Sequence, residues 1–140
     1  MKSKFSKQDQ KTLAIWAADC ATLVLPLFEK KYPRDKRPRQ ALAALRDWLR
    51  GKSRVGPVRQ AALAAHAAAR AATTDPARFA ARAAAQAASV AHVATHAAGA
   101  AYYAVKAAAA AGAVRERERQ RQCLPKRLHS IFKSIPDPNK

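Results

Sequence analysis

The sequence predicts an all-α protein in which about five helices form a single domain. Helix start and stop signals recur along the chain, whereas no segment alternates β-branched or aromatic residues as a strand would. Between Ala61 and Val114, thirty of the 54 residues are alanine, the strongest helix former. The 140 residues fit one domain, which we expect to span residues 1–134, followed by a flexible tail over 135–140.

The first two predicted helices hold most of the large apolar side chains. The first is expected from about Ser6, its N-cap, to Lys31, with Pro26 inside it. Pro38 suits the first turn of the second helix, which stops at Gly51. We expect both helices to supply the core. The large apolar residues in and beside them are Phe5, Leu13, Ile15, Trp16, Leu23, Val24, Leu27, Phe28, Leu42, Leu45, Trp48 and Leu49.

The alanine-rich segment predicts two further helices. A third is expected over residues 57–73 and a fourth over 76–112, separated by the restart signal Thr74-Asp75-Pro76. The length of the fourth predicts a break near Ser89 or Gly99. Because interaxial distance follows the side chains at the contact, the alanine faces predict that the third and fourth helices pack closely.

The net charge is +18, which is extreme for this length. Residues 30–54 contribute +8 and residues 115–140 contribute +5. This charge should attract nucleic acid, anionic surfaces or acidic proteins. A genome-wide bias toward arginine and alanine would explain it equally well. The arginine-rich segment is expected to extend the fourth helix to about Gln122, before a short fifth helix around Ile131.

We expect a cytoplasmic protein that makes no membrane contact. Two cysteines, Cys20 and Cys123, do not make a secreted disulfide framework. The basic residues 1–5 precede no apolar run, so they do not resemble a signal peptide. Polar residues at 102, 103 and 106 interrupt the weakly apolar segment 97–114, which argues against a transmembrane span.

Three histidines occur within the alanine-rich helices, where a buried polar group must be paired or functional. On a straight fourth helix, His92, His96 and Tyr103 share one face, and His66 and Arg70 share a face of the third. We therefore expect His66, His92 and His96 to line a polar pocket between these helices and to set their register. The alternative is a solvated, arginine-rich face with histidines bonded to backbone. Arg78, Arg82 and Ser89 lie on the fourth-helix face, and Arg59 and Leu63 on that of the third.

A metal site is a weaker interpretation of the same residues. His92 and His96 are one turn apart and could chelate a metal, which His66 or Asp19 could complete only through the fold. Val93 occupies the place of the catalytic glutamate in an H-E-x-x-H motif, so no hydrolytic base is supplied. We therefore expect no metal and no cofactor.

Asp19 borders the apolar face of the first helix, beside Trp16 and Cys20. In so basic a chain, we expect it to pair with Arg37, Arg39 or a histidine. Asp19, Arg37 and Arg39 thereby join the candidate polar pocket.

An ordered series of short motifs resembles the class-five immunity proteins of bacterial polymorphic-toxin systems. The resemblance covers about residues 12 to 106. It implies an all-helical, non-enzymatic protein that binds and neutralises a toxin encoded beside it. The motifs are Leu13-Ala-Ile-Trp16-Ala-Ala-Asp19-Cys20, Pro33-x-Asp35-x-Arg37-Pro38-Arg39, Trp48-x-x-Gly51, Ala65-His66-Ala-Ala-Ala-Arg70, Ala91-His92-x-x-x-His96-Ala and Ala101-Tyr102-Tyr103-Ala104.

Three functions follow from these observations. The first is neutralisation of a cognate toxin; because nuclease inhibitors are commonly acidic, a +18 chain favours a toxin with an acidic surface. The second is non-specific nucleic-acid binding through residues 30–54 and 115–126. The third is a metal-dependent enzyme built on His66, His92 and His96. We expect the first.

Overall fold

The computed structural model describes residues 5–113 and 115–135, and every regular element in these ranges is helical. The predicted all-α class is therefore confirmed. Seven helices occur in these ranges, where about five were predicted. They are α1 (Lys7–Glu29), α2 (Arg37–Leu49), α3 (Val55–Ala71), α4 (Asp75–Ser89), α5 (His96–Ala110), α6 (Glu116–Cys123) and the 3-10 helix η1 (Lys126–Ser134).

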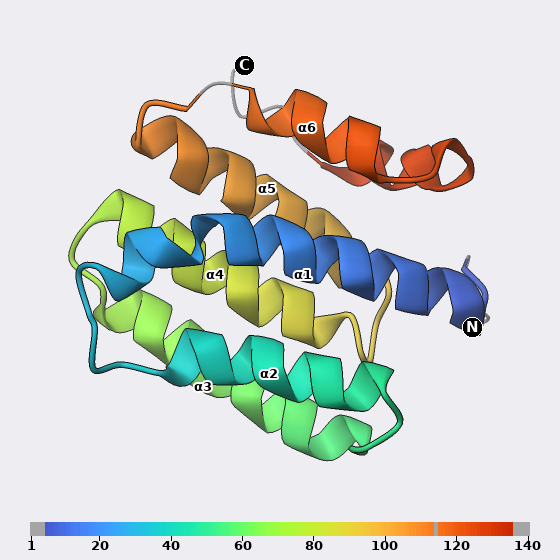
Figure 1. Cartoon of the computed structure of the whole chain (residues 1–140), viewed down its shortest axis with the longest axis horizontal. Helices are drawn as coiled ribbons and strands as arrows, with labels where there is room; N and C mark the ends of the chain where they lie inside the picture. The colour runs from blue at the N-terminus through green and yellow to red at the C-terminus, as the bar shows by residue number, and fades with distance from the viewer. Residues whose placement is uncertain (1–4, 114, 136–140) are drawn as a thin grey trace.

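Helix α4 is the centre of the fold and packs against α1, α2, α3 and α5. Figure 1 shows α2 and α3 at one edge of the molecule and α6 at the opposite edge, with α1, α4 and α5 between them. The last two elements, α6 and η1, both contact α5. The five helices α1–α5 thus form a bundle that α6 and η1 cover on one side.

Alanine allows α4 to have neighbours on nearly all sides. Because its side chain is a single methyl group, facing helices can approach closely without interdigitating large groups. The helix therefore contributes close packing, while most large core side chains come from other helices. The buried alanines of α4 are Ala77, Ala80, Ala81, Ala83, Ala84, Ala85, Ala87 and Ala88.

The predicted fourth helix is divided at residues 90–95, near Ser89 and not at Gly99. The hydroxyl of Ser89 donates to the carbonyl of Ala85 (2.9 Å), a local bond that competes with regular helix geometry. Gln10 of α1 then donates through Nε2 to the carbonyl of Val90, at 2.8 Å, in the segment between the two helices. The arginine-rich segment likewise forms a separate helix, α6. These two divisions account for the larger number of helices.

The predicted stop signals at two glycines have a physical basis. Gly51 and Gly112 follow the last turns of α2 and α5 with φ of 73° and 91°, the left-handed region that favours glycine. After each glycine, the next amide returns to a carbonyl five residues back: Ala113 N donates to Ala108 O at 2.8 Å. At the other end of the chain, Ser6 caps α1 by accepting from Asp9 N at 3.0 Å.

Of the twelve predicted core residues in and beside α1 and α2, six are buried, four are partly buried and two are exposed. Ile15 and Leu23 are each 53% exposed, on the side of α1 away from its buried face. Within the described part of the chain, α1 is the one helix long and apolar enough to cross a membrane, and 56% of its most apolar window is buried inside the structure. Such burial is the pattern of a core helix.

Trp16 of α1 anchors the C-terminal helices to the bundle. Its Nε1 donates to the backbone carbonyl of Gln120 in α6 at 3.0 Å, and its ring meets Phe132 of η1 edge to face. Gln120 is fully buried and donates to Ala101 O of α5 at 2.9 Å. Ile135, at the predicted start of the tail, is buried. Residues 136–140 of the predicted tail lie outside the described residues.

Candidate functional site

A pocket of about 220 Å³ lies where α3 meets the end of α4 and the start of α5. The three histidines of the alanine-rich segment all line it. His66 comes from α3, His92 from the α4–α5 connection, and His96 is the first residue of α5. His66 and His96 are half-buried and His92 is exposed. The other lining residues are Arg59, Ala62, Leu63 and Ser89.

The division of the fourth predicted helix changes how the histidines meet. On a straight helix, His92 and His96 would be stacked one turn apart on one face. In the structure His92 precedes α5, and the two rings lie 5.1 Å apart with an interplanar angle of 52°. The spacing on α3 is regular, since Arg59, Leu63 and His66 fall on one helical face.

His66 is held by an arginine from the neighbouring helix. Arg82 of α4 donates through its NH1 group to His66 Nδ1 at 2.7 Å. A guanidinium has no acceptor atom, so Nδ1 must carry the lone pair and Nε2 the proton. Burial lowers the pKa of His66, and the nearby charges of Arg82 and Arg70 lower it further. His66 is therefore a neutral ring at pH 7 whose Nε2–H is a donor.

His96 has the opposite tautomer. Its Nδ1 is 2.8 Å from Oε1 of Gln86, which can only accept, so Nδ1 carries the proton. The lone pair of neutral His96 is consequently on Nε2, which has no hydrogen-bond partner among the described residues. Burial lowers the pKa of His96. The pocket thus combines one histidine donor and one histidine acceptor.

Gly99 makes room for the Gln86 side chain. A Cβ at this position would lie 2.7 Å from Gln86 Oε1 and 2.8 Å from Cδ, closer than real Cβ contacts allow. The glycine therefore has a steric role in α5, because the Gln86 amide that orients His96 needs this space.

Positive charge surrounds the pocket without a compensating acid. None of its lining residues is acidic. Burial lowers the pKa of His92, and His96 and Arg59 lower it further. In the described part of the chain, the charged groups that influence the three histidines are arginines and the histidines themselves. Such a pocket offers donors and positive potential to an anion.

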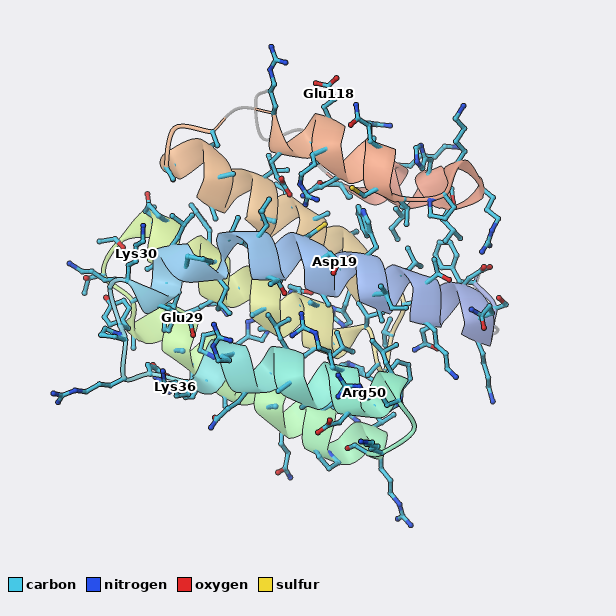
Figure 2. The ribbon with its side chains drawn as sticks, viewed as in Figure 1. Asp19, Glu29, Lys30, Lys36, Arg50 and Glu118 are labelled. Carbon is cyan, nitrogen blue, oxygen red and sulfur yellow. The ribbon has the colours of Figure 1, made fainter. Side chains whose placement is uncertain are left out.

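The predicted association of Asp19 with Arg37 and Arg39 is wrong. Arg37 pairs with Asp35 at 2.7 Å and Arg39 pairs with Glu29 at 2.5 Å. Asp19 is exposed, and Figure 2 shows it on the outer face of α1. Its neighbours four residues away in each direction, Ile15 and Leu23, are exposed as well, so this row of α1 faces solvent. None of Asp19, Arg37 and Arg39 lines the histidine pocket.

Two other predicted members also lie outside the lining. Tyr103 belongs to an aromatic cluster, where its ring stacks on Phe79 with centroids 6.1 Å apart and meets Tyr102 edge to face. Lys106 lies over the Phe79 ring at 5.0 Å. Arg70 is exposed and acts on His66 through its charge alone. The prediction that Tyr103 shares a helix face with His92 and His96 was wrong because the predicted fourth helix is divided into α4 and α5.

The geometry of the histidines does not support a metal site. Over residues 5–113 and 115–135, no three His, Cys, Asp or Glu side chains are grouped as metal ligands. Arg82 also occupies one ring nitrogen of His66. The thiol of Cys20 is elsewhere: burial raises its pKa to about 12, so it packs as a small apolar group.

Gln86, which orients His96, was not among the site residues predicted from the sequence. Gln86 is the one large polar side chain between Arg82 and Ser89, and one helical turn separates it from Arg82. A single polar side chain surrounded by alanines was the sequence signal that could have indicated Gln86. Its partner His96 is in another helix, so the hydrogen bond itself could not be predicted from spacing.

A larger but apolar pocket, of about 470 Å³, lies between α1, α5 and α6. Its walls include Leu23, Val24, Leu27 and Ala108, with Arg115 and Arg119 among the lining residues. This lining offers apolar contact and no grouping of histidines. The histidine pocket is therefore the stronger candidate.

Comparison with known proteins gives one match. A family model described as "Imm-5 like putative immunity protein" matches residues 3–127. The matched range contains α1 to α6 and every residue of the histidine pocket. No curated protein and no solved structure matches the chain.

Proposed function

We propose that this chain, which belongs to the Imm-5-like family of immunity proteins, binds and neutralises a cognate protein toxin without catalysing a reaction. The family match over residues 3–127 carries the proposal, because it covers nearly the whole bundle. A binding protein of this kind needs a surface that recognises its toxin, and the charge of this chain suggests the chemistry of that surface.

The toxin is proposed to present an acidic surface. The chain has 27 Lys and Arg against 9 Asp and Glu, so its basic residues outnumber its acidic residues threefold. Several of the acids are already paired internally, as Asp35 is with Arg37 and Asp75 with Arg78. Complementary charge speeds the encounter of two proteins and suppresses association with wrong partners.

Co-expression tests the proposal. Each gene that flanks the gene for this chain is expressed in a bacterial host, alone and together with the chain. We expect one product to arrest growth alone and the chain to restore growth by forming a complex that co-elutes in gel filtration. His129→Gln is a control variant that should still protect, because His129 lies on η1 and does not line the histidine pocket. Toxicity that the chain does not relieve would contradict the proposal.

Non-specific nucleic-acid binding is a second candidate, favoured by the net charge of +18. Lys30 and Lys36 are exposed near the junction of α1 and α2 (Figure 2). For duplex DNA, log K should fall against log salt with a slope of about −0.9 for each phosphate neutralised. A salt titration with duplexes of unrelated sequence measures this slope. Equal, salt-sensitive affinities would support this candidate, and no binding at low salt would exclude it.

A further inference from the structure

We infer that the histidine pocket is a carboxylate-binding site, which takes one Asp or Glu side chain of the protein partner. The inference rests on the proposed function only for the identity of the partner. The property inferred for the pocket itself, affinity for a carboxylate, can be measured on this chain alone.

The lining supplies what a carboxylate needs. Arg59 is a cation at the pocket, and the neutral His66 ring has its Nε2–H as donor. Charge-assisted hydrogen bonds from such groups to a carboxylate are among the stronger ones in proteins. No acidic side chain lines the pocket to compete for these donors. The electrostatic complement of this lining is an anion.

His96 is the ring best placed to gain a proton when an anion binds. Its Nδ1–H is already engaged by Gln86, and protonation at Nε2 leaves that bond intact. His66 cannot be protonated at Nδ1 without losing the bond from Arg82. The positive charge of the pocket can therefore increase through His96 and the exposed His92, while His66 stays neutral.

The size and surroundings of the pocket favour a side chain of a protein. Sites for whole small molecules span roughly 300–1,000 Å³, and this pocket has about 220 Å³. Two exposed apolar residues adjoin it: Leu63, 68% exposed, is part of the lining, and Val93, 43% exposed, follows His92. A protein partner can bury these exposed apolar side chains, whereas a nucleic-acid backbone would gain little from them.

Binding should depend on pH. In the free chain, His66 faces Arg70, Arg82 and His96, and His92 faces Arg59 and His96. Burial lowers the pKa of all three rings, and the charges of these arginines lower the pKa of His66 and His92 further, so the rings are neutral at pH 7. A bound carboxylate favours the charged form of a nearby imidazole, so binding takes up a proton. Affinity should therefore rise as the pH falls from about 8 to about 6, a range above the carboxylate's own pKa of about 4.

The test is a titration of the folded chain with capped glutamate, followed by NMR of the histidine ring signals at several pH values. Capped glutamine is the neutral control. Only glutamate should shift the signals of His66, His92 and His96, saturably and more tightly at pH 6 than at pH 8. His129 is an internal control, since its ring bonds to Leu124 O and does not line the pocket. Its signal should not move.

Variants separate binding from folding. Arg59→Gln removes a charged partner of the carboxylate. It should lower the affinity for capped glutamate by about tenfold. Arg54→Gln removes an exposed arginine at the start of α3 and should have no such effect. Gly99→Ala displaces Gln86 from His96, so it should move the titration midpoint of His96 to lower pH and weaken binding. A G99A chain that titrates and binds like the parent would contradict the positioning role of Gln86.

Two outcomes would overturn the inference. If capped glutamate leaves the three pocket histidines unmoved, the pocket does not bind carboxylates, and the co-expression result still decides the proposed function separately. If inorganic phosphate binds far more tightly than glutamate and a short oligonucleotide displaces it, the pocket recognises nucleic-acid phosphate. If capped glutamate binds saturably but the chain protects the host from no toxin, the pocket is a carboxylate site and the proposed function is wrong.

Discussion

Replacing Ala84 with leucine is expected to destabilise the fold by about 3 kcal/mol, the upper part of the usual range for overpacking. Ala84 has no exposed surface, and its helix α4 packs against four other helices. Three additional carbon atoms have no free space in such a contact, so neighbouring helices must move apart. Unfolding in urea, followed by circular dichroism, measures the loss.

Ala43→Leu is the matched control for this substitution. Ala43 lies on α2 and is exposed, so leucine there meets solvent and should change the free energy of unfolding by less than about 0.5 kcal/mol. If A84L and A43L unfold at the same urea concentration, α4 is not closely packed, and the role assigned to its alanines is wrong.

Trp16→Ala is expected to cost about 3–5 kcal/mol, which approaches the whole stability of many small domains. The indole joins three elements, because it packs on Phe132 of η1 and donates to Gln120 O of α6 from α1. Alanine leaves a cavity and also leaves a buried carbonyl unpaired. Loss of α6 and η1 from the bundle should accompany the loss of stability, measured as faster hydrogen exchange of their amides.

Trp16→Phe divides this effect into its parts. Phenylalanine retains a ring against Phe132 but lacks the Nε1–H donor, so Gln120 O remains unpaired at a cost of about 1–3 kcal/mol. We expect W16F to fall between the parent and W16A. If W16F is as unstable as W16A, the hydrogen bond dominates; if W16A unfolds like the parent, Trp16 does not anchor the C-terminal helices.

The helices could largely be predicted from the sequence because their end signals are local. Ser6 caps α1 through a residue three positions away, and Gly51 ends α2 by its own backbone conformation. The division between α4 and α5 was predicted only as a break near Ser89 or Gly99. Gln10 helps to stabilise it by binding carbonyls about 80 residues later in the chain, and no local pattern contains that contact.

The candidate site could be predicted only in part, for the same reason. Spacing within each helix indicated His66, His92 and His96, and the structure places them around one pocket. Asp19 was assigned to this group because an acid in a basic chain should find a cation, yet Asp35 and Glu29 lie nearer to the arginines concerned. Contacts between helices decide such pairings, and they depend on the packing of the whole bundle.

The tautomers of His66 and His96 likewise could not be predicted from the sequence. Whether a histidine donates or accepts depends on its partner, and those partners, Arg82 and Gln86, come from a neighbouring helix. A glycine explains why one partner fits, since Gly99 leaves space for the Gln86 side chain where α4 and α5 meet. The steric role of Gly99 follows from the same close contact.

A stoichiometric titration distinguishes toxin binding, the proposed activity of this chain, from catalysis. Once a toxin is identified by co-expression, its purified activity is measured against increasing amounts of the chain. We expect a linear loss of toxin activity that ends at a fixed molar ratio, with the intact toxin recovered in a complex. Complete neutralisation by a small fraction of an equivalent, progressing with time and leaving altered toxin, would contradict it.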